Sequence, residues 1–234
     1  MRTKHAIVLL GCRATPVSID LICEELMKNA HVRVLAVVLA MLSPVCIAAG
    51  NAVQGKAAYA VCSACHGQNG EGNMAMNAPR LAGQEGWYLV RQLEAYRLGH
   101  RGTKPGDTFG MQMRPMASTV STPAAIENLV AYVESLPVAR NAPTVKGDSA
   151  KGKVAYAVCA ACHGQKAEGL EQMGGPRLAG LDDWYLQRQI QNFKKGLRGY
   201  HPEDVFGRQM SPMAATLADD AAIGNVVAYI NTLN

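Results

Sequence analysis

The chain has 234 residues, of which 49% are apolar and 18% charged, and its formal net charge is +5 at neutral pH. This length allows one or two domains, and this composition is ordinary for a soluble globular protein. The small positive charge says little about partners, and nothing in the sequence indicates binding to nucleic acid.

Residues 1–50 are expected to be a leader that directs export. The short apolar run at residues 34–42 follows Lys28 and Arg33 and precedes small residues, which is the layout of a secretory signal peptide. The run is shorter than the roughly 20 apolar residues of a membrane-spanning helix, although an uncleaved anchor is the alternative. Acidic residues upstream fit this layout poorly, so we expect translation to begin at Met27.

Beyond the leader the chain consists of two copies of one unit. Residues 55–136 match residues 152–233 without a gap when the sequence is shifted by 97 positions. The period is too long for a solenoid repeat and suits two complete small domains. We therefore expect domains at residues 51–136 and 151–234, joined by a linker of prolines, glycine and polar residues at 137–150.

In each copy a helix, at residues 55–61 in the first, is expected to lead into a Cys-x-x-Cys-His motif. The residues of the two motifs are Cys62, Cys65 and His66, and Cys159, Cys162 and His163. Two thiols three positions apart can each add to one vinyl group of a single porphyrin, and the adjacent imidazole then becomes an iron ligand. The sequence thus predicts two covalently bound haem c groups and electron transfer.

A cysteine pair can also bind zinc or act as a redox pair. A zinc site would need a second Cys or His pair within about 12–20 residues, and neither motif has one. A thioredoxin-like redox pair would need a surrounding βαβ pattern, which is absent. The only cysteines beyond residue 50 are the four in the motifs, so we expect no structural disulfide.

A Pro-Arg-Leu-Ala-Gly segment begins 13 residues after each motif histidine, at Pro79 and at Pro176. A ligating histidine needs an acceptor for its other ring nitrogen, and a proline carbonyl in a fixed turn could supply it. A simple turn proline is the alternative. The arginines that follow, Arg80 and Arg177, are candidates to pair with a haem propionate, because a guanidinium matches a carboxylate. A solvated surface arginine is the equal alternative.

The periodicity beyond these segments is helical, with no convincing strand pattern. Residues 87–93 carry an apolar stripe, and residues 124–136 form a closing helix with Pro123 near its first turn. In the second copy Asp219 stands at the start of the equivalent helix, where the helix dipole favours negative charge. The aromatic residues of this stripe and their equivalents in the second copy are expected to pack rather than to relay electrons: Trp87, Tyr88, Trp184 and Tyr185.

Methionine is the only candidate for the sixth iron position that recurs in both copies. The repeated candidates are Met113 and Met116, and Met210 and Met213. His100 and His201 have no histidine at the equivalent position of the other copy, so they are read as solvated loop residues. One methionine of each pair is expected to bind iron and the other to fill the core. Since the ligand should lie in an extended loop ahead of the closing helix, stiffened by the proline, we favour Met113 and Met210.

The motifs Cys-x-x-Cys-His, Pro-Arg-Leu-Ala-Gly-Gln and Met-x-Pro-Met resemble those of class I cytochromes c. The gapless duplication is similar to the two-haem cytochrome c4 group over residues 55–233. This resemblance implies an all-α fold of two tandem domains, each wrapped around one covalent haem with His/Met ligation. In such relatives the ligand lies seven positions before the residue that opens the closing helix, here Val120 and Leu217, which again points to Met113 and Met210. Leu181 in place of the glutamine at Gln84 is a small departure.

The leading functional hypothesis is a periplasmic electron carrier that transforms no substrate. It would move single electrons between redox proteins such as membrane oxidases, reductases or a periplasmic dehydrogenase, and be soluble or loosely associated with the membrane. The alternative is the dihaem subunit of a dehydrogenase, for example one that oxidises a sulfur compound. A dihaem peroxidase is less favoured, because it requires an exchangeable iron position where both copies offer methionine.

Overall fold

The structure, a computed structural model, describes residues 50–233. The expected signal peptide and the start at Met27 lie outside the described residues. The described part is helical, with two isolated β-bridges and no strand. This confirms the predicted all-α fold of two tandem domains. No helix between residues 50 and 233 is long and apolar enough to cross a membrane.

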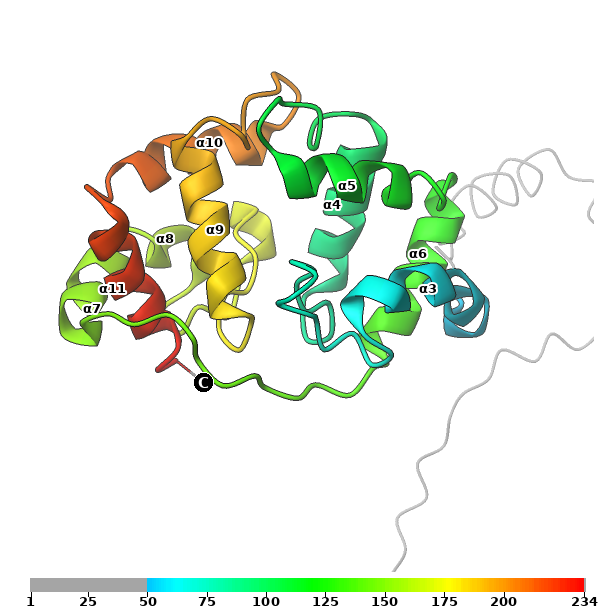
Figure 1. Cartoon of the computed structure of the whole chain (residues 1–234), viewed down its shortest axis with the longest axis horizontal. Helices are drawn as coiled ribbons and strands as arrows, with labels where there is room; N and C mark the ends of the chain where they lie inside the picture. Colours follow the sequence, from blue (N-terminus) through cyan, green and yellow to red (C-terminus); the bar gives the residue numbers. More distant parts are fainter. Residues whose placement is uncertain (1–49, 234) are drawn as a thin grey trace, which may run out of the picture. The chain divides into compact units, whose positions relative to one another are not determined.

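The first copy forms four helices around its own core (Figure 1). They are α3 (Ala52–His66), α4 (Gly86–Arg97), α5 (Thr108–Ala117) and α6 (Pro123–Glu134). Helix α3 packs on α6, and α4 contacts both α5 and α6. The core lies between them and is built mainly from apolar residues of α6, such as the fully buried Ile126.

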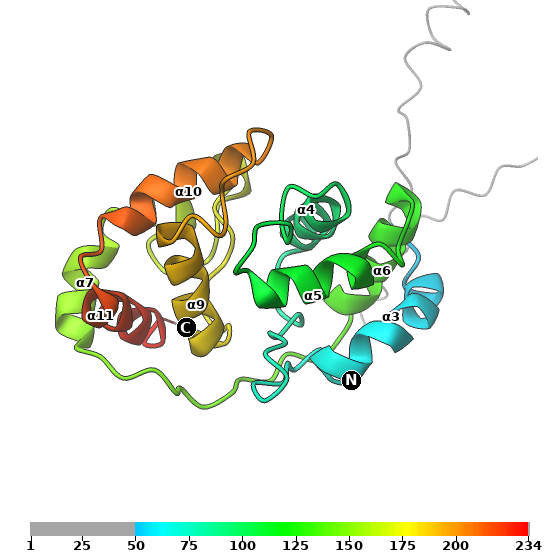
Figure 2. The same cartoon turned by 45° about the horizontal axis from the view of Figure 1, so that its top comes forward.

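The second copy repeats this arrangement of helices (Figure 2). Its elements are α7 (Ser149–Tyr156), α8 (Ala160–His163), a 3₁₀ turn η1 (Glu171–Met173), α9 (Asp183–Lys194), α10 (Val205–Ala215) and α11 (Asp220–Ile230). The helix that leads into the haem motif is continuous in the first copy as α3. In the second copy a turn divides it into α7 and α8.

The closing helices begin where the sequence predicted. Thr122 caps α6 by accepting a hydrogen bond from the amide of Ala125 at 3.2 Å, and Pro123 takes the first helical position, where its missing N–H costs nothing. Asp219 caps α11 by accepting from the amide of Ala222 at 2.8 Å. A capping side chain thus fixes the start of each closing helix.

A glycine allows the first and last helices of each copy to touch backbone to backbone. A side chain at Gly55 of α3 would collide with the carbonyl of Asn128 in α6, and Gly152 of α7 stands in the same relation to Asn225 of α11. Close crossing aligns the apolar faces that form the two equivalent cores. These contacts hold the first helix of each copy, which leads toward the haem motif, against the closing helix.

The prediction that the candidate methionines lie in an extended loop is wrong. Met113 lies within α5 and Met210 within α10. Asp107 and Asp204 cap these helices upstream, and methionine itself favours helix, so the helical conformation begins before the proline is reached. Pro115 and Pro212 are accommodated inside the helices, which end two and three residues later.

Candidate haem sites

The motif histidine of each copy lies at the C-terminal end of a helix, with its ring buried. His66 ends α3, and His163 ends α8. Nδ1 of His66 lies 2.7 Å from the carbonyl oxygen of Pro79, and Nδ1 of His163 lies 2.7 Å from the carbonyl oxygen of Pro176. A carbonyl oxygen only accepts, so Nδ1 carries the proton and Nε2 keeps its lone pair. The contact that the sequence suggested for the two prolines is present in both copies.

The electrostatic environment keeps these rings neutral. Burial lowers the pKa of His66 below its ordinary value, and the hydrogen bond to Pro79 opposes this shift only in part. The pKa of His163 is lowered for the same reasons. A histidine binds a metal in its neutral form, so a buried, oriented ring with a free Nε2 is suited to bind iron.

The cysteines of both motifs are free thiols, partly buried beside the histidines. Burial raises the pKa of Cys62, and likewise that of Cys159, so these thiols stay protonated at neutral pH. Thiols that form no disulfide are available to bond a porphyrin. Within residues 50–233, no group of three or more His, Cys, Asp or Glu side chains is arranged to hold a metal ion.

In the first copy the motif and the candidate methionines line one cavity. Cys62, Cys65 and His66 form part of its wall, and Met113 and Met116 form another part. The two methionines are three positions apart on α5, so both reach the same face of the helix. Each is half-buried, and the structure therefore does not choose between them.

The second copy separates its two methionines by exposure. Met210 is half-buried, whereas Met213 is 39% exposed. Met111, which has no equivalent methionine in the second copy, is 50% exposed and does not line the first cavity. The exposures in the second copy thus agree with Met210 as the inner residue.

Arg80 supports the view that the first cavity takes an anionic group. It lines the cavity and is 5% exposed, yet Nη1 and Nη2 have no hydrogen-bond partner among the described residues. Its Nε lies 4.0 Å from Oδ1 of Asp182, but burial of Nη1 and Nη2 without acceptors is costly. Haem carries two propionates, and a carboxylate is the acceptor that a guanidinium fits best. The residues present therefore fit a haem.

A buried polar network, which the sequence analysis missed, also borders this cavity. Arg101 donates to Gln189 at 2.8 Å and to Tyr185 at 3.1 Å, both in the second copy. Arg198, its equivalent, donates in return to Tyr88 at 2.7 Å and to Gln92 at 2.9 Å in the first copy. The signal that could have revealed it is the retention of the same Tyr, Gln and Arg in both copies. Tyr88 and Tyr185 thus accept hydrogen bonds in addition to the packing that the sequence predicts.

The comparisons with known proteins agree with these sites. The family model for cytochrome c matches residues 52–137 and again residues 149–234. A cytochrome c4 from Azotobacter vinelandii is 32% identical, over 77% of this chain and 89% of the relative. A thiosulfate dehydrogenase electron acceptor from Stutzerimonas stutzeri (strain A1501) is 29% identical, over 68% of this chain and 73% of the relative.

A solved structure gives the same result for the fold. The crystal structure of reduced recombinant cytochrome c4 from Pseudomonas stutzeri matches with a TM-score of 0.62 and 28% identity, and the match covers 80% of this chain and 100% of that one. Two family matches in tandem account for the two Cys-x-x-Cys-His motifs. The chain belongs to the cytochrome c family, as a two-domain protein similar to cytochrome c4 that carries two covalent haem c groups and transfers electrons rather than catalysing a reaction.

Proposed function

We propose that each domain binds its haem through the two motif cysteines and holds the iron between the motif histidine and one methionine. The proposed covalent attachment sites are Cys62, Cys65, Cys159 and Cys162, and the proposed iron ligands are His66, Met113, His163 and Met210. Met116 and Met213 are the alternative ligands. The observation that carries this assignment is the buried His66 ring, with Nδ1 fixed by Pro79, in a cavity that Met113 also lines.

Each bound haem supplies an iron that changes its charge by one electron, and the chain's residues set how readily it does so. A neutral histidine and a thioether favour the reduced iron and raise its reduction potential. Arg80 and Arg177 are proposed to bind propionates, with Arg80 supported by its unpaired buried nitrogens. Pro79 and Pro176 fix the histidine rings.

The experiment that tests this assignment uses the purified holoprotein. Its mass should exceed that of the polypeptide by two haems, and its spectrum should be that of a low-spin c-type cytochrome. His66→Gly should lose the low-spin spectrum of one haem, which added imidazole should restore. A mass that corresponds to one haem or none would refute the proposal.

We also propose that the protein works in the periplasm and exchanges electrons there with other redox proteins. The apolar run of residues 34–42 favours export, and covalent haem attachment outside the cytoplasm agrees with it. Cell fractionation with detection of haem would test the location. Recovery of the haem-loaded protein in the cytoplasm would contradict it.

A narrower partner is favoured by one similarity. The relative from Stutzerimonas stutzeri, an electron acceptor for thiosulfate dehydrogenase, matches most of both chains. The second candidate role is therefore to accept electrons from a dehydrogenase that oxidises a sulfur compound. Stopped-flow reduction of this protein by such an enzyme, compared with reduction by an unrelated donor, would separate this role from that of a general carrier.

A further inference from the structure

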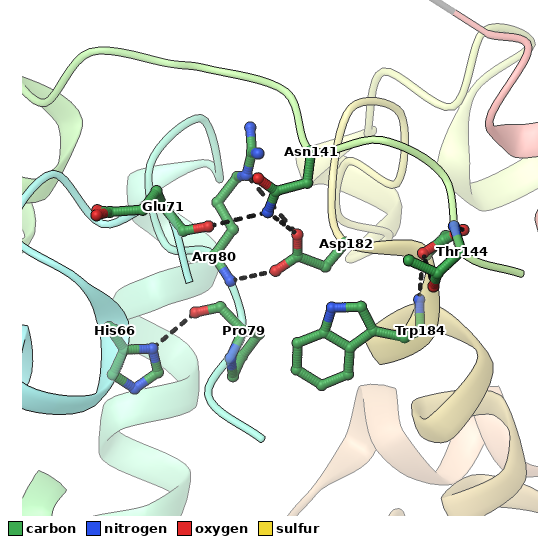
Figure 3. A network of polar contacts seen from close by, with 9 residues as sticks. His66, Glu71, Pro79, Arg80, Asn141, Thr144, Asp182 and Trp184 are labelled. Atoms are coloured by element: carbon green, nitrogen blue, oxygen red, sulfur yellow. Dashed lines mark hydrogen bonds and ion pairs between the residues drawn. The ribbon is translucent and has the colours of Figure 1, made fainter. Parts of the chain in front are cut away.

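The peptide bond between Pro79 and Arg80 makes a hydrogen bond at each of its two ends (Figure 3). Its carbonyl oxygen accepts from Nδ1 of His66 at 2.7 Å, and its N–H donates to Oδ2 of Asp182 at 2.7 Å. The peptide group is conjugated. When a carboxylate accepts a hydrogen bond from its N–H, more negative charge moves onto its carbonyl oxygen, which becomes a stronger acceptor. A carboxylate is thus linked to the proximal histidine through one amide group.

The second copy contains the same chain of contacts with the roles of the copies exchanged. The carbonyl of Pro176 accepts from Nδ1 of His163 at 2.7 Å, and the N–H of Arg177 donates to Oε2 of Glu85 at 2.8 Å. Glu85 and Asp182 occupy equivalent positions of the two copies. Each carboxylate therefore reaches the peptide group behind the histidine of the other copy.

The two carboxylates give up a local role to make these contacts. Glu85 is the N-cap residue of α4, and Asp182 is that of α9, yet neither side chain caps its own helix. An aspartate at an N-cap ordinarily accepts from the first turn of its helix. Here the side chain instead turns to an amide in the other copy, and Asn141 of the linker donates to its Oδ1 at 2.7 Å.

A glycine leaves space for the carboxylate in each copy. A Cβ atom on Gly72 would lie 2.6 Å from the amide nitrogen of Arg80 and 2.8 Å from Oδ2 of Asp182. A Cβ atom on Gly169 would lie 2.6 Å from the amide nitrogen of Arg177 and would collide with the carboxylate of Glu85. The same accommodation in both copies indicates that the contact is a built feature of the fold.

We propose that Asp182 and Glu85 are positioning residues that set the reduction potential of the haem in the opposite copy. The carboxylate polarises the peptide group, the peptide carbonyl accepts more strongly from Nδ1, and the histidine becomes a stronger electron donor at Nε2. A stronger donor stabilises the oxidised iron and lowers the potential. This inference rests on the proposed function, in which His66 and His163 bind iron.

The test is a redox titration of holoprotein variants in which each haem is followed separately. In a Cys62→Ala background the first haem keeps one unreacted vinyl group, which shifts its visible absorption away from that of the second. In this background Asp182→Asn should favour reduction of the first haem about threefold in the equilibrium constant. For one electron this corresponds to a reduction potential that is ~30 mV higher. The second haem should not shift.

The reciprocal variant removes a competing explanation. Asp182 also lies 4.0 Å from the guanidinium of Arg80, so its charge could act through that side chain. The described residues include no ion pair between Glu85 and Arg177, so the effect of Glu85→Gln cannot act through such a pair. Glu85→Gln should raise the potential of the second haem alone. Both variants keep the shape of the side chain.

Matched controls remove carboxylates that neighbour Asp182 and Glu85 but do not contact the Pro79–Arg80 or Pro176–Arg177 peptide group; Asp183 is buried and Glu134 is exposed. Asp183, next to Asp182, accepts from Thr144 and Val145 of the linker, and Glu134 accepts from the amide of Gly86. Asp183→Asn and Glu134→Gln should each shift the reduction potentials of the two haems by much less than Asp182→Asn or Glu85→Gln shifts one of them. Equal shifts in variant and control would mean that only general charge acts, and would overturn the proposal.

A second readout reports on the hydrogen bond itself. In the reduced, diamagnetic protein the proton between His66 Nδ1 and the Pro79 carbonyl should move upfield by NMR in Asp182→Asn, because a weaker acceptor leaves it less deshielded. The proposal would be refuted if the resonance of this proton did not move. It would also be refuted if the potential shifted for the haem of the copy that carries the substitution. Failure of the proposed function would differ, since it would appear in the parent protein as a missing haem or a missing histidine ligand.

Discussion

Replacing Met113 with alanine should remove the thioether from one iron and leave the other unchanged. The weak far-red absorption band of a methionine bound to oxidised haem iron should fall to about half, and one of the two potentials should drop, because a lost thioether favours the oxidised iron. Met113 and Met116 line the same cavity. The comparison of Met113→Ala with Met116→Ala therefore decides which of them binds iron.

The expected cost of Met116→Ala is one of packing. Replacing a fully buried methionine with alanine lowers the free energy of unfolding by about 2–5 kcal/mol. Met116 is only half-buried, so we expect Met116→Ala to lower it by roughly 1–2 kcal/mol. Met213 is 39% exposed, so Met213→Ala should cost less, below about 1 kcal/mol. Denaturant unfolding of the holoprotein would measure both values. If Met116→Ala loses the band while Met113→Ala keeps it, the assignment moves three residues along α5.

Three further outcomes are expected. Cys162→Ala should weaken attachment of the second haem and spare the first, which mass spectrometry would show as a loss of one haem; loss of both would contradict independent sites. Gly55→Ala should lower stability by about 1–3 kcal/mol, because its Cβ would collide with the Asn128 carbonyl, although alanine alone favours a helix by up to about 1 kcal/mol; exposed Ala57→Gly is the control for propensity, and a stabilised Gly55→Ala would refute the close crossing. Burial opposes ionisation of Asp183, but hydrogen bonds from Val145 and Thr144 outweigh it and lower its pKa. Its contribution is therefore present above the unfolded value near 4 and is lost as pH falls through the lower folded pKa, so Asp183→Asn should reduce the thermal midpoint at pH 7 more than at pH 3, and an equal reduction at both would contradict the sign.

The features that the sequence predicted well are those encoded by local pattern. The haem motifs depend on fixed spacing, and the closing helices depend on periodicity and on caps such as Thr122 and Asp219, all within a few residues of one another. The region of Met113 was predicted wrongly because a proline was given more weight than the cap at Asp107, which starts α5 eight residues before Pro115. A proline in the last turns of a helix distorts it without preventing it.

The contacts between copies could not be predicted in this way, because they join residues that no local pattern connects. Asp182 lies 102 positions from the amide it accepts from, and its place directly before α9 reads as an ordinary N-cap. Glu85 is not a favoured N-cap residue, and the difference between Glu and Asp hides their equivalence in the two copies. Only the fold places each beside the proline segment of the other copy.

The exchange of polar groups between copies explains why a duplicated chain can bury charge that one copy could not. Arg101 and Arg198 are both buried, and each donates to a tyrosine and a glutamine side chain of the opposite copy. These acceptors are neutral, so two like charges share one network, which is favourable only if anions lie nearby. We expect the propionates of the two bound haems to supply such anions. A substitution of Arg101 should therefore disturb both haems, in contrast to Asp182→Asn, which should shift one.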